Sequence, residues 1–566
     1  MKKTNSFIYK IVIGILVVFI LWFIITIFLL PLINIIQKSF FINGMFSFDN
    51  IKEVFSSSRV QRSLINTLII SLATIITVNI FSIFKILITE YYHLKFSRIL
   101  KLAYCVPFIY RGIAMVRGYD FIYSSDGIIT KTITNIFPNA DPYWFQGFIA
   151  ILIVHTFSLG VFHFLFGSNA VKSIDYNMIE TAQSLGASNR KILTKIILPL
   201  IKPTLLFTTI LVFISSLTSV AAPEILGKGF HMISPTIRNL NSIGFQDMSA
   251  VLSMVLGLVS LLLLLIFKFF ENKSKYYSVG KVATKMKKIP IKNKKNYIII
   301  TIIAWFIFLI YMFPVVINII YSFTDIQTIS TKSLPNFLNF DNYIRVFSTE
   351  SILNPLINTF RISIIAVVIS LVIGVTVAII NKNKNKYAVF LEYPLLIPWL
   401  FPPLSLSLGL IIAYNTPQLI TFNLISIGSY LILPVAYTFY IIYMIMYAVK
   451  ANLKTINNNI LESACSLGSN EVKTFFLITL PIILPTILAV TAIAFNSLLL
   501  EFTVSELLYI TQNRPLSITY ISEFSNYNPY GSANILVYTV IIMIISMLIL
   551  FFTRRFNKLD KQSNNM

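Results

Sequence analysis

The sequence predicts an all-α integral membrane protein of about twelve transmembrane helices, built as two homologous halves of six helices each. Of its 566 residues, 56% are hydrophobic and only 12% are charged, and the mean hydropathy is +0.80. A soluble domain has about 25% charged residues. The apolar residues also fall into runs of roughly 20, the length of a helix that crosses a bilayer. A third observation, an internal repeat, divides these runs into two sets.

Apolar runs place six spans in each half of the chain. In the first half, the predicted spans are 9–33, 64–88, 99–118, 147–168, 203–224 and 249–270. In the second half, they are 297–320, 356–380, 391–413, 427–449, 485–506 and 534–553. The first run is too long for the hydrophobic region of a signal peptide, and no small-residue cleavage site follows it. We therefore expect a first half over residues 1–270, a basic linker over 271–296 and a second half over 297–566.

A polar motif occurs once in each half and indicates that the chain is an internal duplication. Both copies read E-x-A-x3-G-x9-I-x-L-P, and every anchor of the second copy lies 282 residues after its counterpart. The anchors are Glu180, Ala182, Gly186 and Pro199 in the first copy, and Glu462, Ala464, Gly468 and Pro481 in the second. Other pairs match at slightly larger offsets, and the offset changes in loops, where a duplicated fold tolerates insertions.

The repeated motif resembles the cytoplasmic EAA loop of permease subunits in binding-protein-dependent ABC importers of the type I fold. In that family the loop docks on an ATPase subunit, so the resemblance implies that all eight anchors couple the chain to an ATPase. Two loops imply two ATPase copies, which would hold ATP and Mg²⁺. The resemblance also implies a separate extracytoplasmic substrate-binding protein. The chain has no G-x4-G-K-[ST] phosphate loop. We therefore expect a non-catalytic subunit without a cofactor of its own.

The distribution of basic residues predicts the orientation of the chain. Lys and Arg outnumber Asp and Glu by 45 to 21, but they cluster in short loops beside apolar runs, as the positive-inside rule describes for cytoplasmic loops. This pattern argues against a nucleic-acid partner, and the family resemblance implies a bacterial inner membrane. We expect the N-terminus, the linker 271–296, both motif-bearing loops and the C-terminus to lie on the cytoplasmic side.

Polar residues near the end of the two spans that follow the motifs are candidates for lining a transport path. The family resemblance favours this interpretation, because that span commonly borders the path, and ionisable residues inside a membrane are costly. The candidates are Ser219, Glu224, Glu501 and Glu506. The alternative is that Glu501 bonds a neighbouring helix and that Glu224 and Glu506 are solvated helix ends.

The histidines and cysteines suggest neither a metal site nor a disulfide framework. His155 and His163 lie eight residues apart in one predicted span, and their counterparts in the second half are Tyr437 and Ile445. We expect both histidines to pack against neighbouring helices, and no metal ligand is assigned. Four scattered His and two Cys do not have the spacing of a catalytic metal site, which argues against a membrane enzyme.

The fusion of both halves into one chain bears on the transported solute. A fused chain of this length resembles the ferric-iron permease branch of the family, and the thiamine and aminoethylphosphonate branches share the fused plan. The stretch from Glu501 to Leu516 matches a ferric-type segment in its Glu and in Arg514-Pro515, but not in a preceding Lys or in a Pro after the Glu. Oxygen ligands suit a hard cation such as Fe(III). We expect ferric iron, with thiamine, aminoethylphosphonate or another small solute as alternatives. A proton-coupled secondary transporter is a more remote alternative, because it would need no EAA loop.

Overall fold

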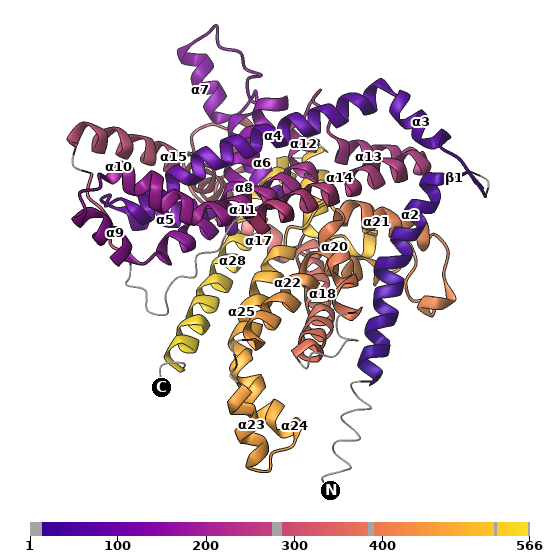
Figure 1. The fold of residues 1–566 in the computed structure, drawn as a ribbon. Coiled ribbons are helices and arrows are strands. Elements are labelled where there is room, and N and C mark those ends of the chain that lie inside the picture. The colour runs from indigo at the N-terminus through magenta and orange to yellow at the C-terminus, as the bar shows by residue number, and fades with distance from the viewer. Residues whose placement is uncertain are drawn as a thin grey trace.

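The structure is a computed structural model in which the described residues are 14–563, except 43, 274–285, 292, 383–389, 455, 457 and 526–528. Residues 1–13 and half of the predicted linker 271–296 lie outside this part of the chain. The described chain is a bundle of helices (Figure 1) with one short hairpin, in which Phe41 of β1 pairs with Phe46 of β2.

The first half contains long helices joined by short ones, where η marks a 3-10 or π turn. A continuous helix runs from Gly14 to Phe40 and includes η1 and α2. The elements are η1 (Ile24–Leu29), α2 (Leu30–Phe40), β1 (Phe41–Ile42), β2 (Met45–Phe46), α3 (Asp49–Ser56), α4 (Ser58–Ile86), η2 (Leu87–Tyr91), α5 (Ser97–Tyr104), η3 (Val106–Phe108), α6 (Gly112–Tyr123), α7 (Ile128–Ile136), α8 (Gly147–Lys172), α9 (Tyr176–Ser184), α10 (Asn189–Ile192), η4 (Leu193–Ile197), α11 (Leu198–Leu217), α12 (Ala221–Leu226), α13 (Ile233–Ser242) and α14 (Gln246–Lys273).

The second half repeats this order with different short helices. Its elements are α15 (Lys294–Ser322), α16 (Ile326–Thr331), α17 (Asp341–Ser348), α18 (Glu350–Lys382), η5 (Pro394–Leu396), α20 (Ile397–Leu400), α21 (Pro403–Ala413), η6 (Leu419–Thr421), α22 (Ile432–Leu453), α23 (Asn458–Ser466), α24 (Glu471–Thr474), η7 (Phe475–Thr479), α25 (Leu480–Leu498), α26 (Ser505–Leu508), η8 (Thr511–Asn513), α27 (Leu516–Ser525) and α28 (Pro529–Ser563).

These helices confirm the predicted all-α membrane fold. Ten helices of the described chain are long and apolar enough to cross a bilayer. An eleventh candidate is a pair of helices, 97–108 and 112–136, bent by 110°. The shorter apolar helix α21 occupies the place of the predicted span 391–413. Each of the twelve predicted spans therefore has a counterpart, and two of these are broken.

Proline and glycine break the two spans that were predicted over 99–118 and 391–413. In the first, Pro107 lies in η3, and Gly112 has a φ of +58° where α6 begins. In the second, Pro402 lies between α20 and α21, and Pro403 is the first residue of α21. Proline cannot donate a backbone hydrogen bond, and glycine tolerates positive φ, so both favour a bend over a straight helix. The sequence predicted one continuous span over 99–118 and one over 391–413, and the structure has a broken helix in both places.

The predicted spans 203–224 and 485–506 extend too far. The helix α11 ends at Leu217 and α25 ends at Leu498, and each is followed by a bend and a short helix, α12 or α26. Pro223 fits the first turn of α12, where a missing N–H leaves no helical bond unmade. Consequently Glu224, Glu501 and Glu506 lie beyond the long helices rather than within them.

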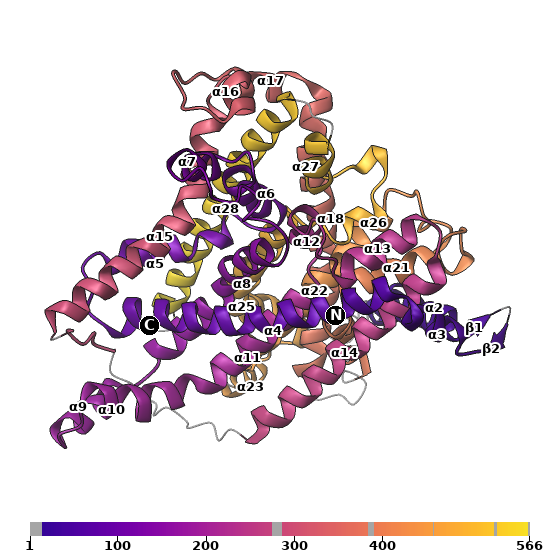
Figure 2. The same ribbon diagram turned by 90° about the horizontal axis from the view of Figure 1, so that it is seen from above.

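The first long helix of each half packs on the opposite half. The helix that ends in α2 contacts α21, and α15 contacts α5 and α6 (Figure 2). The Tyr414 hydroxyl donates to the carbonyl of Thr26 over 2.7 Å, and the Tyr119 hydroxyl donates to the carbonyl of Ile310 over 3.1 Å. The two halves are thus interlocked, and the core is shared between them.

Two equivalent glycines allow these crossings. Gly118 and Gly409 are related by an offset of 291, the same offset that relates Pro107 to Pro398. A Cβ atom at Gly409 would lie 2.6 Å from the carbonyl oxygen of Pro31. A Cβ atom at Gly118 would overlap the Tyr110 hydroxyl and would lie 2.7 Å from Nδ2 of Asn318 on α15, which donates a hydrogen bond to that hydroxyl. In both halves the missing side chain lets the opposite half's first helix approach closely.

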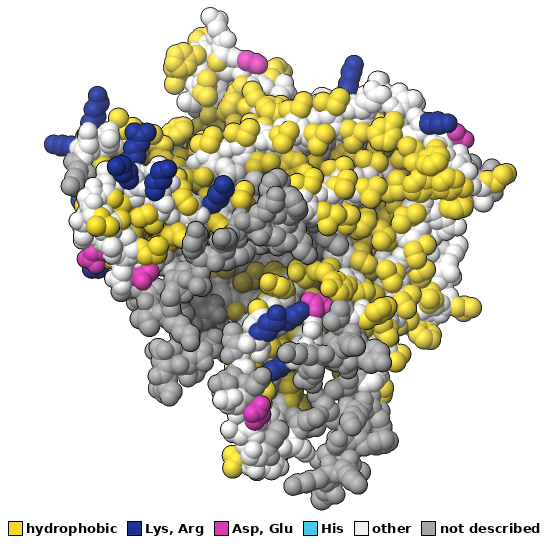
Figure 3. Space-filling view, in the orientation of Figure 1, with side chains coloured by type: hydrophobic (Ala, Val, Ile, Leu, Met, Phe, Trp, Pro, Cys, Tyr) yellow, Lys and Arg dark blue, Asp and Glu magenta, His cyan; other side chains and the backbone are white. Residues whose placement is uncertain are grey.

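The surface divides into an apolar region and a basic end. Hydrophobic side chains cover a broad area over α2, α3 and α4, and Lys and Arg collect at the left, where Figure 1 labels α5, α10 and α15 (Figure 3). Exposed apolar side chains on α4 include Ile65, Leu72, Ile76 and Ile80. An apolar surface of this extent suits lipid, whereas the basic end suits the membrane surface.

Candidate functional site

The first copy of the repeated motif folds into two short helices separated by a glycine. The Asp175 carboxylate caps α9 by accepting from the N–H of Asn177, and the Ser188 hydroxyl caps α10. Between them Gly186 has a φ of +80°. Its N–H donates to the carbonyl of Gln183, and the next N–H, that of Ala187, donates to the carbonyl of Ala182. This pair of bonds is a Schellman ending, in which glycine relieves the steric cost of the left-handed conformation.

The second copy has the same geometry. Gly468 has a φ of +81° and ends α23, and the N–H of Ser469 donates to the carbonyl of Ala464 over 3.0 Å. Asn470 then caps α24 by accepting from the N–H of Lys473. The duplication therefore preserves a helix-turn-helix shape, although the residues after the glycine differ between the copies.

Both motifs present the same exposed features. Glu180 and Glu462 are exposed, whereas Ala182 is half-buried and Ala464 is buried. A Cβ atom at Gly186 or Gly468 would meet nothing within 4 Å. The positive φ, rather than a contact within the chain, is therefore what requires glycine at these positions, and the space beside each glycine is open to a partner.

An exposed leucine precedes the glycine in each copy, and the sequence analysis did not predict it as a contact residue. The exposed fraction is 83% for Leu185 and 88% for Leu467. An apolar side chain at the tip of a polar loop is a strong anchor for a protein partner, because its burial removes apolar surface from water. The signal was present in the sequence, since Ser-Leu-Gly occurs in both copies.

The proline of the motif follows a π-helical turn in both halves. A π turn precedes each proline, η4 before Pro199 and η7 before Pro481. The N–H of Leu198 donates to Leu193, and that of Leu480 donates to Phe475, five residues back in each case. Because proline has no N–H, the ladder is already interrupted there, which favours the wider turn. The motif helices are thus joined to α11 and α25 in the same way.

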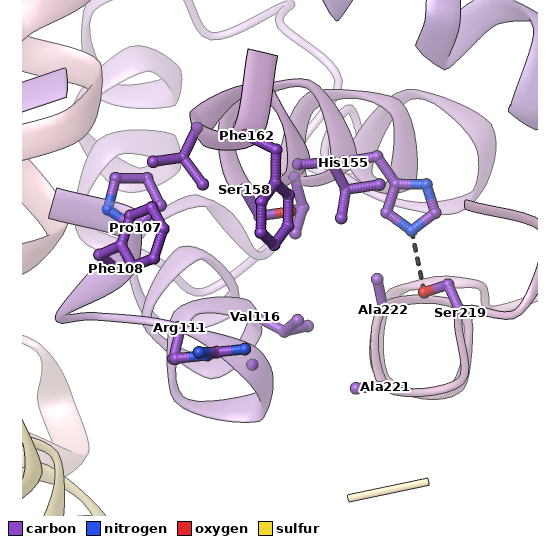
Figure 4. Close-up of a pocket in the computed structure, with 14 residues that line it drawn as sticks. Pro107, Phe108, Arg111, Val116, His155, Ser158, Phe162, Ser219, Ala221 and Ala222 are labelled. Atoms are coloured by element: carbon purple, nitrogen blue, oxygen red, sulfur yellow. Dashed lines mark hydrogen bonds between the residues drawn. The ribbon is translucent and has the colours of Figure 1, made fainter. Parts of the chain in front are cut away.

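A cavity of about 210 Å³ lies in the first half beside the broken third span (Figure 4). It is bordered by Pro107, Phe108, Arg111, Gly112, Val116, Val154, His155, Ser158, Leu159, Val161, Phe162, Ser219, Ala221 and Ala222. His155 lies in one wall, where its ring nitrogens are 3.1 Å from the Ser216 hydroxyl and 3.0 Å from the Ser219 hydroxyl. Of the four path candidates, Ser219 borders this cavity.

Glu501 is buried in the second half and forms a cap. Its carboxylate accepts from the N–H groups of Val504 and Ser505 at 3.1 to 3.2 Å and from the Tyr440 hydroxyl at 2.6 Å. These bonds satisfy the first N–H groups of α26. The carboxylate is therefore bonded to its own turn and to α22, and its contact with a solute stays a prediction.

Arg238 joins the other two carboxylates across the two halves. Its guanidinium lies 3.0 Å from Glu224 and also pairs with Glu506. Glu224 and Glu506 occupy equivalent positions after the two motifs, so one arginine of α13 connects equivalent residues of both halves. No sequence pattern points to this pair, because the contact between Arg238 and Glu506 spans 268 positions.

His163 packs between helices, as the sequence suggests. Its Nε2 lies 3.1 Å from Oδ1 of Asn79 on α4. Within the described chain, no group of three or more His, Cys, Asp or Glu side chains is placed to hold a metal ion.

A curated relative covers nearly the whole chain. A probable ABC transporter permease protein from Sinorhizobium fredii is 33% identical over 537 residues, which are 94% of each chain. Residues 2–275 also match the family model of the binding-protein-dependent transport system inner membrane component. The chain belongs to this permease family. It is therefore a multi-pass membrane component of an inner-membrane transport system, and permeases of this kind work with an ATPase and a binding protein.

Two further relatives of this permease are more distant. The ferric transport system permease protein FbpB of Actinobacillus pleuropneumoniae is 23% identical over 532 residues, 92% of this chain and 75% of that protein. The spermidine/putrescine transport system permease protein PotB of Salmonella typhimurium is 22% identical over 286 residues, 48% of this chain and 97% of that protein. The permease thus has one relative that matches most of its length and one that matches half of it. The two relatives are named for the transport of different solutes.

Proposed function

We propose that this permease carries out ATP-driven import and that α9 and α23 each dock on one subunit of an ATPase dimer. The observation that carries the proposal is the matched geometry of the two loops. Each has a short helix, a glycine at positive φ and a strongly exposed leucine, 282 residues apart. Two equivalent docking surfaces on one chain fit two equivalent partners.

The coupling step follows from how the loops are attached. On the far side of each glycine, a short helix continues through a π turn into α11 or α25. A movement of the docked ATPase subunits would therefore be passed directly to the spans that end beside α12 and α26. ATP and Mg²⁺ are expected on the ATPase, and the substrate-binding protein is expected at the opposite membrane face.

The orientation is proposed from charge. The basic end over α5, α10 and α15 (Figure 3), where the first motif loop lies, supports a cytoplasmic position for that loop. The second motif loop and both termini are proposed on the same side, because basic residues adjoin them in the sequence as well. A single cysteine at Lys285 in a cysteine-free background would report it, since labelling of intact cells by an impermeant reagent would contradict this orientation.

Ferric iron is the solute we propose, and its support is the relative named as a ferric transport permease, which matches most of the chain. Thiamine, aminoethylphosphonate or another small solute is the alternative, which the half-length relative named for spermidine and putrescine keeps open. A binding assay of the partner binding protein with each of these solutes would decide between them.

The docking proposal is tested by replacing both exposed leucines. The double variant Leu185→Ser, Leu467→Ser removes two apolar anchors, each of which contributes about 1.5–3 kcal/mol when fully buried. We expect the ATPase to dissociate from the permease during detergent purification. The matched control is Leu419→Ser, because Leu419 is 84% exposed but lies in η6, away from both loops.

The amount of ATPase that co-purifies with each variant is the readout. A normal yield of monodisperse permease shows that the double variant is folded. Stoichiometric ATPase on the folded double variant, together with full transport, would reject docking through these leucines.

A further inference from the structure

Arg111 borders the cavity beside the broken third span, and its charge is unmatched there. Among the described residues, its side chain has no hydrogen bond or ion pair, and the cavity lining contains no Asp or Glu. A charge that is withdrawn from water without a partner is costly, and inside a membrane it is a mark of function. The guanidinium is therefore free to bind a group that enters the cavity.

The hydrogen bonds of Glu501 explain why this carboxylate of the second half does not pair with Arg111. Gly112 follows Arg111, and a Cβ atom there would lie 3.0 Å from the carbonyl oxygen of Leu500. The second half is thus in close contact at this point. The next residue, Glu501, is nevertheless directed to the N–H groups of α26 and to Tyr440. Its carboxylate is already bonded, and Arg111 keeps its positive charge.

The polar residues that border this cavity are not repeated at the equivalent positions of the second half. The counterpart of Arg111 is Pro402, at the offset of 291 that relates Pro107 to Pro398, and the counterpart of His155 is Tyr437. A residue needed only for the fold would be expected in both halves. Arg111, His155 and Ser158 make this cavity of the first half polar (Figure 4), whereas Pro402 and Tyr437 stand at the positions equivalent to Arg111 and His155.

A second cavity with a surplus of basic residues lies on the other side of α12. It measures about 260 Å³, and its lining includes Arg59, Lys228 and Arg238. The one carboxylate in this lining, Glu224, is 3.0 Å from Arg238. Ala222 of α12 borders the first cavity, and Glu224 of the same helix borders the second. The short helix α12 therefore separates two neighbouring cavities, both of which carry excess positive charge.

We propose that the solute carries an anionic oxygen group, either a carboxylate or a phosphonate, and that Arg111 binds this group in the cavity beside α12 as the solute passes through the permease. A guanidinium binds such groups through two parallel hydrogen bonds. This inference rests on the proposed importer function and specifies the charge of its cargo. The anionic group could belong to an organic anion or to a carboxylate chelator that carries ferric iron. In the second case, iron crosses within an anionic complex and needs no ligand cluster from the chain.

The experiment measures binding to the purified permease–ATPase complex in nanodiscs. The probes are labelled aminoethylphosphonate, ferric citrate labelled on both iron and citrate, and labelled thiamine as a cation. We expect one of the two anionic probes to bind, to be displaced by inorganic phosphate or by citrate, and thiamine not to bind. Equal retention of iron and citrate labels identifies a chelate, whereas phosphonate binding alone identifies an organic anion.

Three variants assign the binding to Arg111. Arg111→Gln removes the charge and should weaken binding of the anionic probe by about 10- to 100-fold, the range for a charge-assisted hydrogen-bonded pair. Arg111→Lys keeps the charge but loses the two-pronged guanidinium, so its binding should fall between that of wild type and that of Arg111→Gln. Arg62→Gln is the matched control, because Arg62 is exposed on α4 and borders neither cavity. If Arg111→Gln fails to fold, Arg111→Met replaces it, because this variant removes the charge from a side chain of similar length and should weaken binding of the anionic probe to the same extent.

The outcomes separate this inference from the importer proposal. Thiamine binding, or anion binding that Arg111→Gln leaves unchanged, overturns the inference even if ATP-driven uptake persists. Absence of binding by both anionic probes at millimolar concentration overturns it as well. Anion binding that depends on Arg111, in a complex that shows no ATP-driven uptake, supports the inference and rejects the importer proposal.

Discussion

Both carboxylate oxygens of Glu501 accept hydrogen bonds from the turn that begins α26. They bond the N–H of Val504 at 3.1 and 3.2 Å, and the Tyr440 hydroxyl donates to one of them. A glutamine keeps one acceptor but points an NH₂ group toward backbone donors. We expect Glu501→Gln to reduce stability by about 1–3 kcal/mol, because a buried donor is left unpaired.

Thermal unfolding of the purified permease checks this expectation. The variant Tyr440→Phe removes one of the same hydrogen bonds and should lower stability by about 1 kcal/mol. An unchanged melting temperature for Glu501→Gln combined with lost uptake would contradict the capping role and would assign Glu501 to the transport path instead.

Single residues were predictable from the sequence where a repeated pattern named them. The anchors Glu180 and Gly186 could be selected because an equivalent pair recurs 282 residues later. Arg111 could not, because its significance depends on which side chains surround it in the folded chain. Arg238 could not either, since the sequence does not show that it pairs with Glu506 on the other half.

The crossing of the first helix onto the opposite half depends on a glycine in α21. A side chain at Gly409 would meet the carbonyl oxygen of Pro31 at 2.6 Å, and backbone cannot yield as a side-chain end can. We expect Gly409→Leu to overpack this contact and to destabilise the permease by about 1–3 kcal/mol. The control Gly229→Ala should have little effect, because nothing lies within 4 Å of a Cβ atom there.

The measurement is limited proteolysis, with thermal unfolding as a second readout. Cleavage that separates the first helix should accelerate in Gly409→Leu and stay at the wild-type rate in Gly229→Ala. Equal cleavage rates and melting temperatures in all three proteins would show that the crossing does not require a glycine at this position.

Element types followed from hydropathy, whereas element ends did not. Runs of roughly 20 apolar residues were enough to place the spans, because backbone groups in lipid must bond within a helix. The ends of α11 and α25 fall earlier than expected because apolar residues continue past the helix, through Val220 and Phe502, into buried turns. Hydropathy alone does not distinguish a buried turn from the end of a helix.

The whole molecule is two interlocked halves with one motif loop each. The Lys85 ammonium of α4 donates a hydrogen bond of 2.7 Å to the hydroxyl of Tyr311 on α15, which joins the halves inside the core. The duplication was visible in the sequence, but the exchange of first helices was not, because motif spacing contains no information on which helices touch. This interlocking explains how two loops on one chain can act on a shared core.

The most direct test of ATP-driven coupling is uptake by proteoliposomes that contain the permease, its ATPase and its binding protein. We predict two ATPase copies per permease by native mass spectrometry, and uptake that requires ATP on the face that bears α9 and α23. Uptake should be lost in the Leu185→Ser, Leu467→Ser variant. Uptake driven by a proton gradient without ATP, or a permease that carries no ATPase, would contradict this coupling.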